Sequence, residues 1–177
     1  VRGGMAVFFP SYELLNAIAA YLPEDVRRRV IVERRELSKG EKNRLYELLR
    51  DDHEGILLAV QGGSFSEGMD YESNTLKAII VVGLPLSPPT LEVKTIEAYY
   101  AGKYGAAKGK LYGYLYPAMT KVQQAAGRGI RSEQDRCIIV LMDYRFAYRP
   151  YKTCLPLDYE MTFTDRVELY CRDFLGN

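Results

Sequence analysis

Long hydrophobic runs are missing from this sequence. Its longest unbroken apolar stretches, residues 78–82 and 137–142, fall far short of the roughly 18 residues that a membrane-spanning helix needs. The first apolar stretch, residues 5–10, is also too short for the central segment of a signal peptide. We therefore predict no membrane partner. Because the sequence starts at Val1 without an initiator Met, we interpret that start as a cut made upstream.

Cysteine and histidine are scarce as well. The 3 cysteines, Cys137, Cys154 and Cys171, are too few and too widely spaced for a disulfide framework or a zinc site. The single histidine, His53, stands in an acidic turn and is interpreted as a surface residue rather than a base or ligand. These absences predict no metal site and favour a reducing, intracellular setting.

Two common nucleotide-binding motifs are also absent. No Gly-Lys-Ser/Thr sequence ends any glycine-rich loop, so the chain has no P-loop. The turn after the first apolar run reads Phe-Pro-Ser-Tyr (residues 9–12) and lacks the glycines of a dinucleotide-binding turn. Primary nucleotide binding must therefore lie elsewhere or be absent, and a dinucleotide enzyme is disfavoured.

The composition that is present indicates a folded protein. With 177 residues, 47% hydrophobic and 27% charged, the chain has the size of one domain or of a piece of a larger protein. The net charge of +1 hides an uneven distribution, because residues 94–152 carry 11 basic and 4 acidic side chains. This basic block is typical of a surface that faces a polyanion, although a solvated face would look the same.

Apolar strands alternate with helical patterns along the chain. Continuous apolar runs of this kind predict an α/β layer fold with a largely parallel sheet. In such sheets, function collects on the loops at the carboxyl ends of the strands. The expected strands are residues 5–9, 30–32, 55–60, 78–82 and 137–142; the expected helices begin near residues 11, 39, 91, 117 and 167.

Two of the loops after strands carry residues that suit phosphates. Ser11, before the first helix, offers a hydroxyl beside free backbone N–H groups, though it can equally be a simple helix cap. Residues 62–70 contain three glycines, two serines and two carboxylates. Glycines let the backbone approach a ligand closely, and carboxylates suit a ribose hydroxyl or an arginine. An irregular loop without a ligand is the alternative.

A third segment, residues 124–131, is the most informative. If it is helical, Gln124, Arg128 and Arg131 follow an i, i+4, i+7 spacing and project from one face. Gly127 and Gly129 are unfavourable in a helix, so they need a reason such as close backbone approach. Two arginines with a glutamine among small residues are suited to clamp a γ-phosphate.

Two of these segments resemble motifs of superfamily 2 helicases. Ser-Glu-Gly-Met-Asp at residues 66–70 looks like motif V, and Gln-x-x-Gly-Arg-x-x-Arg at residues 124–131 looks like motif VI. The combination resembles the XPD branch, the iron–sulfur DNA helicases that include DinG-like enzymes. Residues 7–12, 82–85 and 143–146 fit the same branch, and the compact loops resemble archaeal members. The resemblance covers nearly the whole chain in order.

The resemblance implies a RecA-like second motor domain, with a parallel sheet covered by helices on both faces. Residues 1–150 would form that domain, and residues 151–177 its C-terminal tail and terminal helix. In this family the Walker lysine, the Asp-Glu-Ala-His box and the iron–sulfur ligands belong to the first motor half. ATP and Mg²⁺ would therefore be held mainly by that half, and we expect this chain alone to be inactive. The enzyme would move 5′ to 3′ on DNA in repair.

The resemblance to superfamily 2 helicases also implies roles for individual residues. Arg128 and Arg131 would reach the γ-phosphate as arginine fingers, with Gln124 beside them. Other residues would line the same cleft or face single-stranded DNA. The cleft residues are Glu67, Gly68 and Asp70, and the DNA-facing residues are Ser11, Tyr12, Ser64 and Ser66.

The basic block suggests two further roles. Its lysines and tyrosines, between residues 94 and 121, have the composition of a single-strand track, although most of the tyrosines are expected to pack. In eukaryotic relatives the corresponding domain docks a regulatory subunit, so an interaction module is the alternative function, with residues 144–159 as its surface. The resemblance implies a cytoplasmic, nucleoid-associated setting for an archaeal protein and a nuclear one for eukaryotic relatives.

Overall fold

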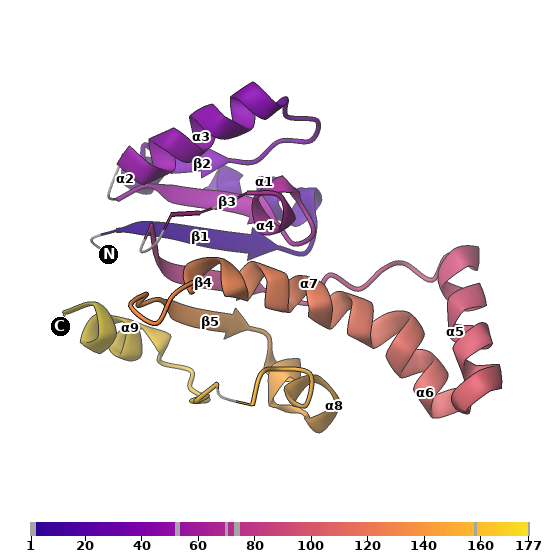
Figure 1. Cartoon of the computed structure of the whole chain (residues 1–177). Coiled ribbons are helices and arrows are strands. Elements are labelled where there is room, and N and C mark those ends of the chain that lie inside the picture. The colour runs from indigo at the N-terminus through magenta and orange to yellow at the C-terminus, as the bar shows by residue number, and fades with distance from the viewer. Residues whose placement is uncertain (1–2, 52–53, 70, 73–74, 158, 177) are drawn as a thin grey trace.

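A five-stranded, wholly parallel sheet forms the centre of the protein (Figure 1). The computed structural model describes residues 3–51, 54–69, 71–72, 75–157 and 159–176. The strands follow the order β2-β3-β1-β4-β5 across the sheet. Their bounds are β1 Gly4–Phe9, β2 Val30–Val32, β3 Ile56–Val60, β4 Leu76–Val82 and β5 Ile138–Met142. The prediction of an α/β fold with a parallel sheet is confirmed.

The middle strands are buried because both of their faces are covered. Every residue of β3 is buried, and the other two interior strands, β1 and β4, are a mixture of buried and half-buried residues. Coverage of both faces explains why these segments read as continuous apolar runs rather than alternating ones. The edge strand β5 is only half-buried and ends on the exposed Met142.

Helices connect the strands and begin at residues that cap them. The Ser11 hydroxyl accepts from the Leu14 N–H at the start of α1, and Ser38 and Glu41 form the expected capping box of α3. The longer helices are α1 Tyr12–Tyr21, α3 Lys39–Asp51, α5 Leu91–Tyr104, α7 Tyr116–Ala126 and α9 Val167–Gly176. The short ones are α2 Glu24–Arg27, α4 Ser64–Glu67, α6 Ala106–Lys110 and α8 Arg149–Lys152.

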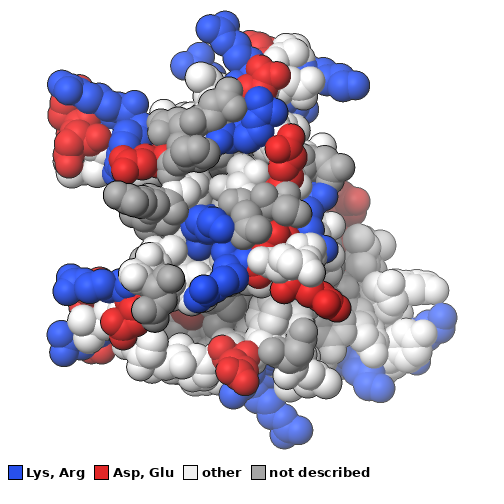
Figure 2. All heavy atoms as spheres, turned by 60° about the vertical axis from the view of Figure 1, so that its left-hand side comes forward, with Lys and Arg blue, Asp and Glu red and all other residues white. Residues whose placement is uncertain are grey.

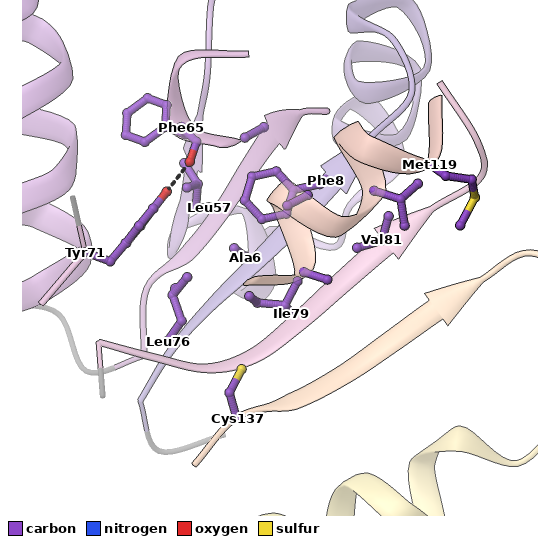
Figure 3. Packing of buried hydrophobic residues seen from close by; sticks show 14 of the residues in the cluster. Ala6, Phe8, Leu57, Phe65, Tyr71, Leu76, Ile79, Val81, Met119 and Cys137 are labelled. Atoms are coloured by element: carbon purple, nitrogen blue, oxygen red, sulfur yellow. Dashed lines mark hydrogen bonds between the residues drawn. The ribbon is translucent and has the colours of Figure 1, made fainter. Parts of the chain in front are cut away.

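Two hydrophobic clusters lie on the sheet. The larger contains Phe8, Leu57 and Ile79, with Met119 and Val122 of α7 packed on them (Figure 3). The smaller joins Leu15 of α1 to alternate residues of β1 and β3. Since successive strand residues point to opposite faces, two separate clusters mean that the sheet is covered on both faces, as predicted.

A helical hairpin projects from the carboxyl end of the sheet (Figure 1). Helix α5 packs along α6 and the π-helix η1 Leu111–Leu115, which runs on into α7. Gly109 and Gly113 allow this contact, because a Cβ on Gly113 would lie 2.9 Å from the backbone of Glu97. The sequence patterns did not predict that residues 106–115 are helical.

One sequence expectation about geometry is wrong. Helix α7 ends at Ala126 and is followed by a short 3-10 turn, η2 Gly127–Gly129, and by Ile130 in an extended conformation. Gln124, Arg128 and Arg131 therefore do not share one helical face, because Arg131 lies beyond the helix.

Across the described part of the chain, no helix has the length and apolar character needed to cross a membrane.

Candidate functional site at the carboxyl ends of the strands

The loops that follow β1, β3, β4 and β5 meet at one edge of the sheet. All strands are parallel, so their carboxyl ends point the same way (Figure 1). The edge carries Ser11 and Tyr12 after β1, residues 61–68 after β3, Gly83 after β4 and Asp143 after β5. It is the position where ligands of open α/β sheets bind.

Ser11 and Tyr12 are both half-buried at this edge. Ser11 uses its hydroxyl to cap α1, so the simple helix-cap role is present. The Tyr12 ring carries the Arg35 guanidinium 5.1 Å from its centroid, a cation–π contact. Burial and the nearby Glu33 raise the pKa of the Tyr12 hydroxyl, which keeps it a neutral hydrogen-bond donor.

The loop after β3 divides into an exposed and a buried part. Glu67 and Gly68 are exposed and Ser64 is half-buried. Ser66 is fully buried and donates its hydroxyl to the Gly63 carbonyl at 3.0 Å. The expectation that Ser66 faces DNA is therefore corrected, since its hydroxyl is used inside the loop. Asp70, expected to line the cleft, lies outside the described residues.

A buried carboxylate that sequence reasoning missed supports this loop. Glu33, directly after β2, is 1% exposed and accepts hydrogen bonds from the backbone N–H groups of Val60, the last residue of β3, and of Ser64 in the loop. Burial raises the pKa of its carboxyl group, and the backbone hydrogen bonds partly offset this. The signal was present in the sequence as an acidic residue directly ending an apolar strand.

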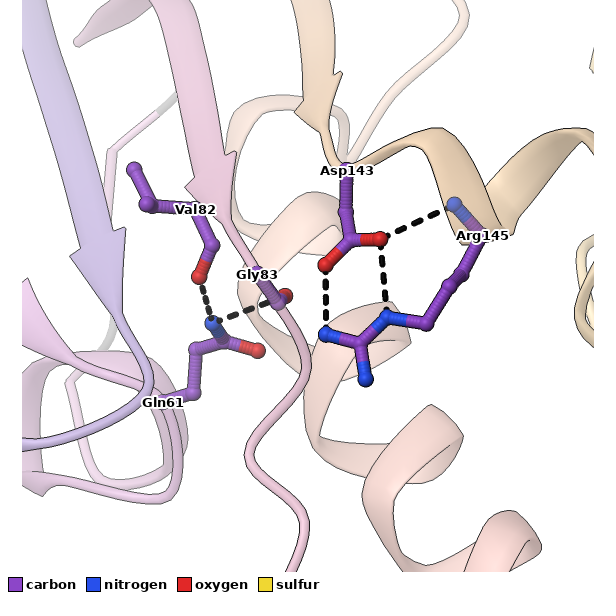
Figure 4. Close-up of polar contacts among 5 residues, drawn as sticks. All are labelled: Gln61, Val82, Gly83, Asp143 and Arg145. Carbon is purple, nitrogen blue, oxygen red and sulfur yellow. Dashed lines mark hydrogen bonds and ion pairs between the residues drawn. The ribbon is translucent and has the colours of Figure 1, made fainter.

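Gln61 holds the ends of three strands together. Its side-chain amide donates to the carbonyls of Val82 at 2.9 Å and Gly83 at 3.4 Å (Figure 4). It also donates to the Phe8 carbonyl at 3.4 Å. These bonds join the end of β3 to the ends of β1 and β4. The side chain is 3% exposed, so the junction is protected from water.

An ion pair closes the same edge on the β5 side. Asp143 and Arg145 form a two-point contact at 2.6 and 2.9 Å (Figure 4). These hydrogen bonds hold the pKa of the Asp143 carboxyl below its usual value. Asp143 also caps the following turn by accepting from the Arg145 backbone N–H.

The two arginines of residues 128–131 meet the loop after β3 from the side of α7. Arg128 donates from Nε to the Ser66 carbonyl at 2.6 Å and from a terminal nitrogen to the Met69 carbonyl at 2.7 Å. Arg131 also approaches the Met69 carbonyl, at 3.5 Å, and is exposed. Gln124 is exposed on α7. The structure thus joins the two segments that the sequence singled out.

The expected close approach at the two glycines of this turn is confirmed for one of them. A Cβ on Gly129 would lie 2.3 Å from the Cys137 Sγ, which only glycine avoids. No atom lies within 4 Å of the corresponding position on Gly127. Gly129 therefore sets how closely residues 127–131, which we call the arginine turn, pack on the sheet.

Tyrosines of the basic block contact one another on the projecting hairpin, although Tyr99, Tyr104 and Tyr116 are exposed. Tyr100 contacts Tyr99, Tyr104 and Tyr112, and Tyr112 contacts Tyr116. Lys121, by contrast, extends to the loop after β3, where its side-chain carbons lie 3.3 Å from the place of a Cβ on Gly62.

Charges elsewhere are mixed. On the face that Figure 2 shows, Lys and Arg lie among Asp and Glu, which is typical of a solvated surface. Within the described ranges, no group of three or more His, Cys, Asp or Glu side chains is arranged to hold a metal ion.

The sequence of residues 1–160 matches the family model of the helicase C-terminal domain. The chain belongs to this helicase C-terminal domain family. Among curated relatives, the regulator of telomere elongation helicase 1 homolog of Drosophila melanogaster is 32% identical over 161 residues, covering 82% of this chain and 16% of the relative. The ATP-dependent DNA helicase CHL1 of Candida albicans is 30% identical over 163 residues, covering 81% and 19%. The chain therefore spans less than a fifth of these relatives.

Solved structures show the same fold. An XPD helicase superposes with a TM-score of 0.69 at 24% identity, covering 86% of this chain and 27% of that one. The C-terminal domain of the DEAD-box protein Dbp5 superposes with a TM-score of 0.57 at 16% identity, covering 98% and 83%. The RecA-like architecture expected for a helicase C-terminal domain is confirmed by these neighbours.

Proposed function

We propose that this helicase C-terminal domain is the second motor domain of an ATP-dependent DNA helicase of the XPD-like, iron–sulfur branch. The observation that carries the proposal is the meeting of Arg128 and Arg131 at the Met69 carbonyl. This places two cations beside the loop whose other end lies at the carboxyl edge of the sheet. The loop after β3 can then respond to ATP through the two arginines and to DNA through its other end.

The arginines suit phosphoryl transfer. Charge spreads over the γ-phosphate oxygens in the transition state, and an arginine supplied from a second domain stabilises it. Arg131 is exposed and Arg128 is half-buried, so we assign Arg131 the direct reach to the γ-phosphate and Arg128 a place beside it, with Gln124 alongside. ATP and Mg²⁺ would be held mainly by a first motor domain. Any iron–sulfur cluster would also be bound there and not by this chain.

The carboxyl edge suits the backbone of single-stranded DNA. Ser64 and Tyr12 are accessible there, and contacts to sugar and phosphate position a strand without reading its sequence. Lys121 beside Gly62 adds a cation to this surface. Movement from 5′ to 3′, a role in DNA repair, an archaeal source and a nucleoid or nuclear setting follow from the resemblance and stay predictions.

The test is DNA-stimulated ATP turnover by the intact helicase. Arg131→Ala is expected to lower turnover about a thousandfold while single-strand affinity, measured in the same buffer, is retained. Arg128→Ala should also lower turnover, but it releases the Ser66 and Met69 carbonyls of the loop and is therefore expected to weaken single-strand affinity as well. Arg44→Ala, an exposed arginine on α3, is the matched control and should leave turnover unchanged. The isolated 177-residue chain should show no turnover. Wild-type turnover in both arginine variants would contradict the proposal.

A protein-interaction module is the second candidate. Tyr144 and Tyr148 form an edge-to-face pair after β5 and are 75% and 57% exposed. Nearby, an apolar hollow of about 890 Å³ lies between β5 and residues 159–174. Exposed aromatic side chains are enriched where proteins dock. Single-strand binding that weakens steeply with salt favours the motor domain, and binding of a regulatory subunit without DNA binding favours this alternative.

A further inference from the structure

Glu33 is an acidic residue in a place that disfavours charge. It follows β2 at the carboxyl edge of the sheet, and its side chain is 1% exposed. A carboxylate removed from water is unfavourable unless hydrogen bonds replace the lost hydration. Its retention in the interior therefore requires specific partners.

Those partners are backbone N–H groups at the end of β3 and in the loop that follows it. One carboxylate oxygen of Glu33 accepts from the Val60 N–H at 2.8 Å, and the other from the Ser64 N–H at 2.8 Å. These donors bracket residues 61–63, so the carboxylate binds the turn as an anion would.

The same carboxylate explains why residue 63 is a glycine. A Cβ at this position would lie 2.7 and 2.9 Å from the two Glu33 oxygens. It would also lie 2.8 Å from the Val60 carbonyl. The glycine is required by an internal side chain, and the backbone N–H of Ser64 already has a partner.

Hydrogen bonds continue from Glu33 to the arginine turn. Ser64 is held by Glu33 at the beginning of α4, and the Ser66 hydroxyl binds Gly63 within that turn. The Ser66 carbonyl then accepts from Arg128 at 2.6 Å. The loop is thus fixed at one end by a carboxylate and at the other by a guanidinium.

We propose that Glu33 is a positioning residue that holds the loop after β3, so that Ser64 is presented to the DNA backbone while the Ser66 and Met69 carbonyls are presented to Arg128. The inference rests on the proposed motor function. It adds an anchor outside the recognisable motifs and assigns the Ser64 N–H of the loop to an internal carboxylate instead of a DNA phosphate.

The sign of the effect on DNA affinity separates positioning from charge. A negative side chain near DNA repels phosphates, so removal of the charge alone would tighten DNA binding. Loss of the loop's anchor would weaken DNA binding instead. Glu33→Gln therefore gives opposite results for the two roles. Glu33→Asp keeps the charge but is one methylene shorter and cannot reach both N–H groups.

The experiment uses the intact helicase. Hydrogen exchange of the peptide spanning residues 61–69 reports on the anchor, and ATP turnover titrated with single-stranded DNA reports on positioning. Glu47→Gln, on an exposed position of α3, is the matched control. Melting temperatures show whether each variant is folded. If Glu33→Gln does not fold, the same measurements are made on Glu33→Asp.

We expect both Glu33 variants to speed exchange in this peptide about tenfold. The half-saturating DNA concentration should rise about tenfold, as for one lost hydrogen bond to a charged group, with turnover at saturating DNA within about threefold of wild type. A merely structural defect would instead lower turnover at saturating DNA. Glu47→Gln should change neither measurement.

Three results overturn the inference. Lowered turnover at saturating DNA in both Glu33 variants means that the carboxylate serves the structure of the domain and not the placement of DNA. Unchanged exchange in both Glu33 variants means that the carboxylate does not hold the loop. Faster exchange with unchanged or tighter DNA binding means that the loop's position does not serve DNA. If wild-type turnover does not respond to DNA, the proposed function itself fails and the DNA role of Glu33 falls with it, while the exchange data still decide the anchor.

Discussion

Arg128 donates its Nε hydrogen to the backbone carbonyl of Ser66 at 2.6 Å, across 62 positions of sequence. A second nitrogen of the same guanidinium binds the Met69 carbonyl at 2.7 Å. One planar side chain therefore fixes two points of the loop after β3. Lysine, with a single ammonium group, cannot reproduce this fork.

Replacement of Arg128 by lysine should consequently lower stability while preserving charge. We expect Arg128→Lys to reduce the free energy of unfolding by about 1–2 kcal/mol, because at least one loop carbonyl loses its donor. Urea unfolding of the 177-residue chain measures the change. Arg44→Lys on the exposed face of α3 is the control. Equal unfolding midpoints for wild type and Arg128→Lys would show that the fork adds no stability.

The two glycines around Arg128 should respond differently to alanine. Gly129→Ala places a methyl group 2.3 Å from the Cys137 Sγ, and the overpacking should cost about 1–3 kcal/mol. Gly127→Ala meets no atom within 4 Å at a φ of −68° and should be neutral or stabilise by up to about 1 kcal/mol. Thermal unfolding of both variants checks the contrast. A similar loss at both positions would refute the packing explanation.

Asp143 should make stability depend on acid. Its pKa is lowered in the folded protein by the hydrogen bonds from Arg145, so the folded state binds the proton less readily than the unfolded state. The stabilisation of the folded state by ionised Asp143 is therefore complete above pH 3.8, the ordinary pKa of an aspartate. It is lost as the pH falls through the lowered pKa.

Urea midpoints at neutral and acidic pH test this prediction. Wild type should lose more stability than Asp143→Asn when the pH is lowered below about 4. Glu47→Gln controls for removal of a carboxylate from a position exposed to solvent. If Asp143→Asn and wild type lose the same stability in acid, the ion pair is not the source of the acid sensitivity.

Cys137 should be the least reactive of the three thiols. Burial raises its pKa to about 12, so almost no thiolate forms at neutral pH. Cys154 and Cys171 are only half-buried. Alkylation at pH 8 followed by peptide mass spectrometry should modify these two first, and all three at similar rates in denaturant. Early modification of Cys137 in the native protein would contradict its packing against Gly129.

The order of elements could be predicted well from the sequence. Strands β1, β3 and β4 are largely apolar runs because they lie in the interior of a sheet that is covered on both faces, and such runs are visible without a structure. The capping box at Ser38 and Glu41 likewise depends on neighbours three positions apart. The helical stretch 106–115 was not predicted, because its glycines are unfavourable in an isolated helix and become useful only beside α5.

The candidate site could be predicted in part. The motifs at residues 66–70 and 124–131 were both singled out, and the structure joins them through Arg128. The buried position of Ser66, the end of α7 at Ala126 and the contacts of Gln61 were not visible. Each of these depends on residues that are distant in sequence.

The sequence by itself determined the local features of this protein: its hydrophobic periods, its helix caps and the residue types of its motifs. These are set by interactions between residues within a few positions of one another. Only the tertiary structure decided that the Glu33 carboxylate occupies the turn at Gly63 and that Arg128 binds the opposite end of the same loop. Burial and hydrogen-bond geometry arise when distant segments pack together, so a linear pattern does not contain them.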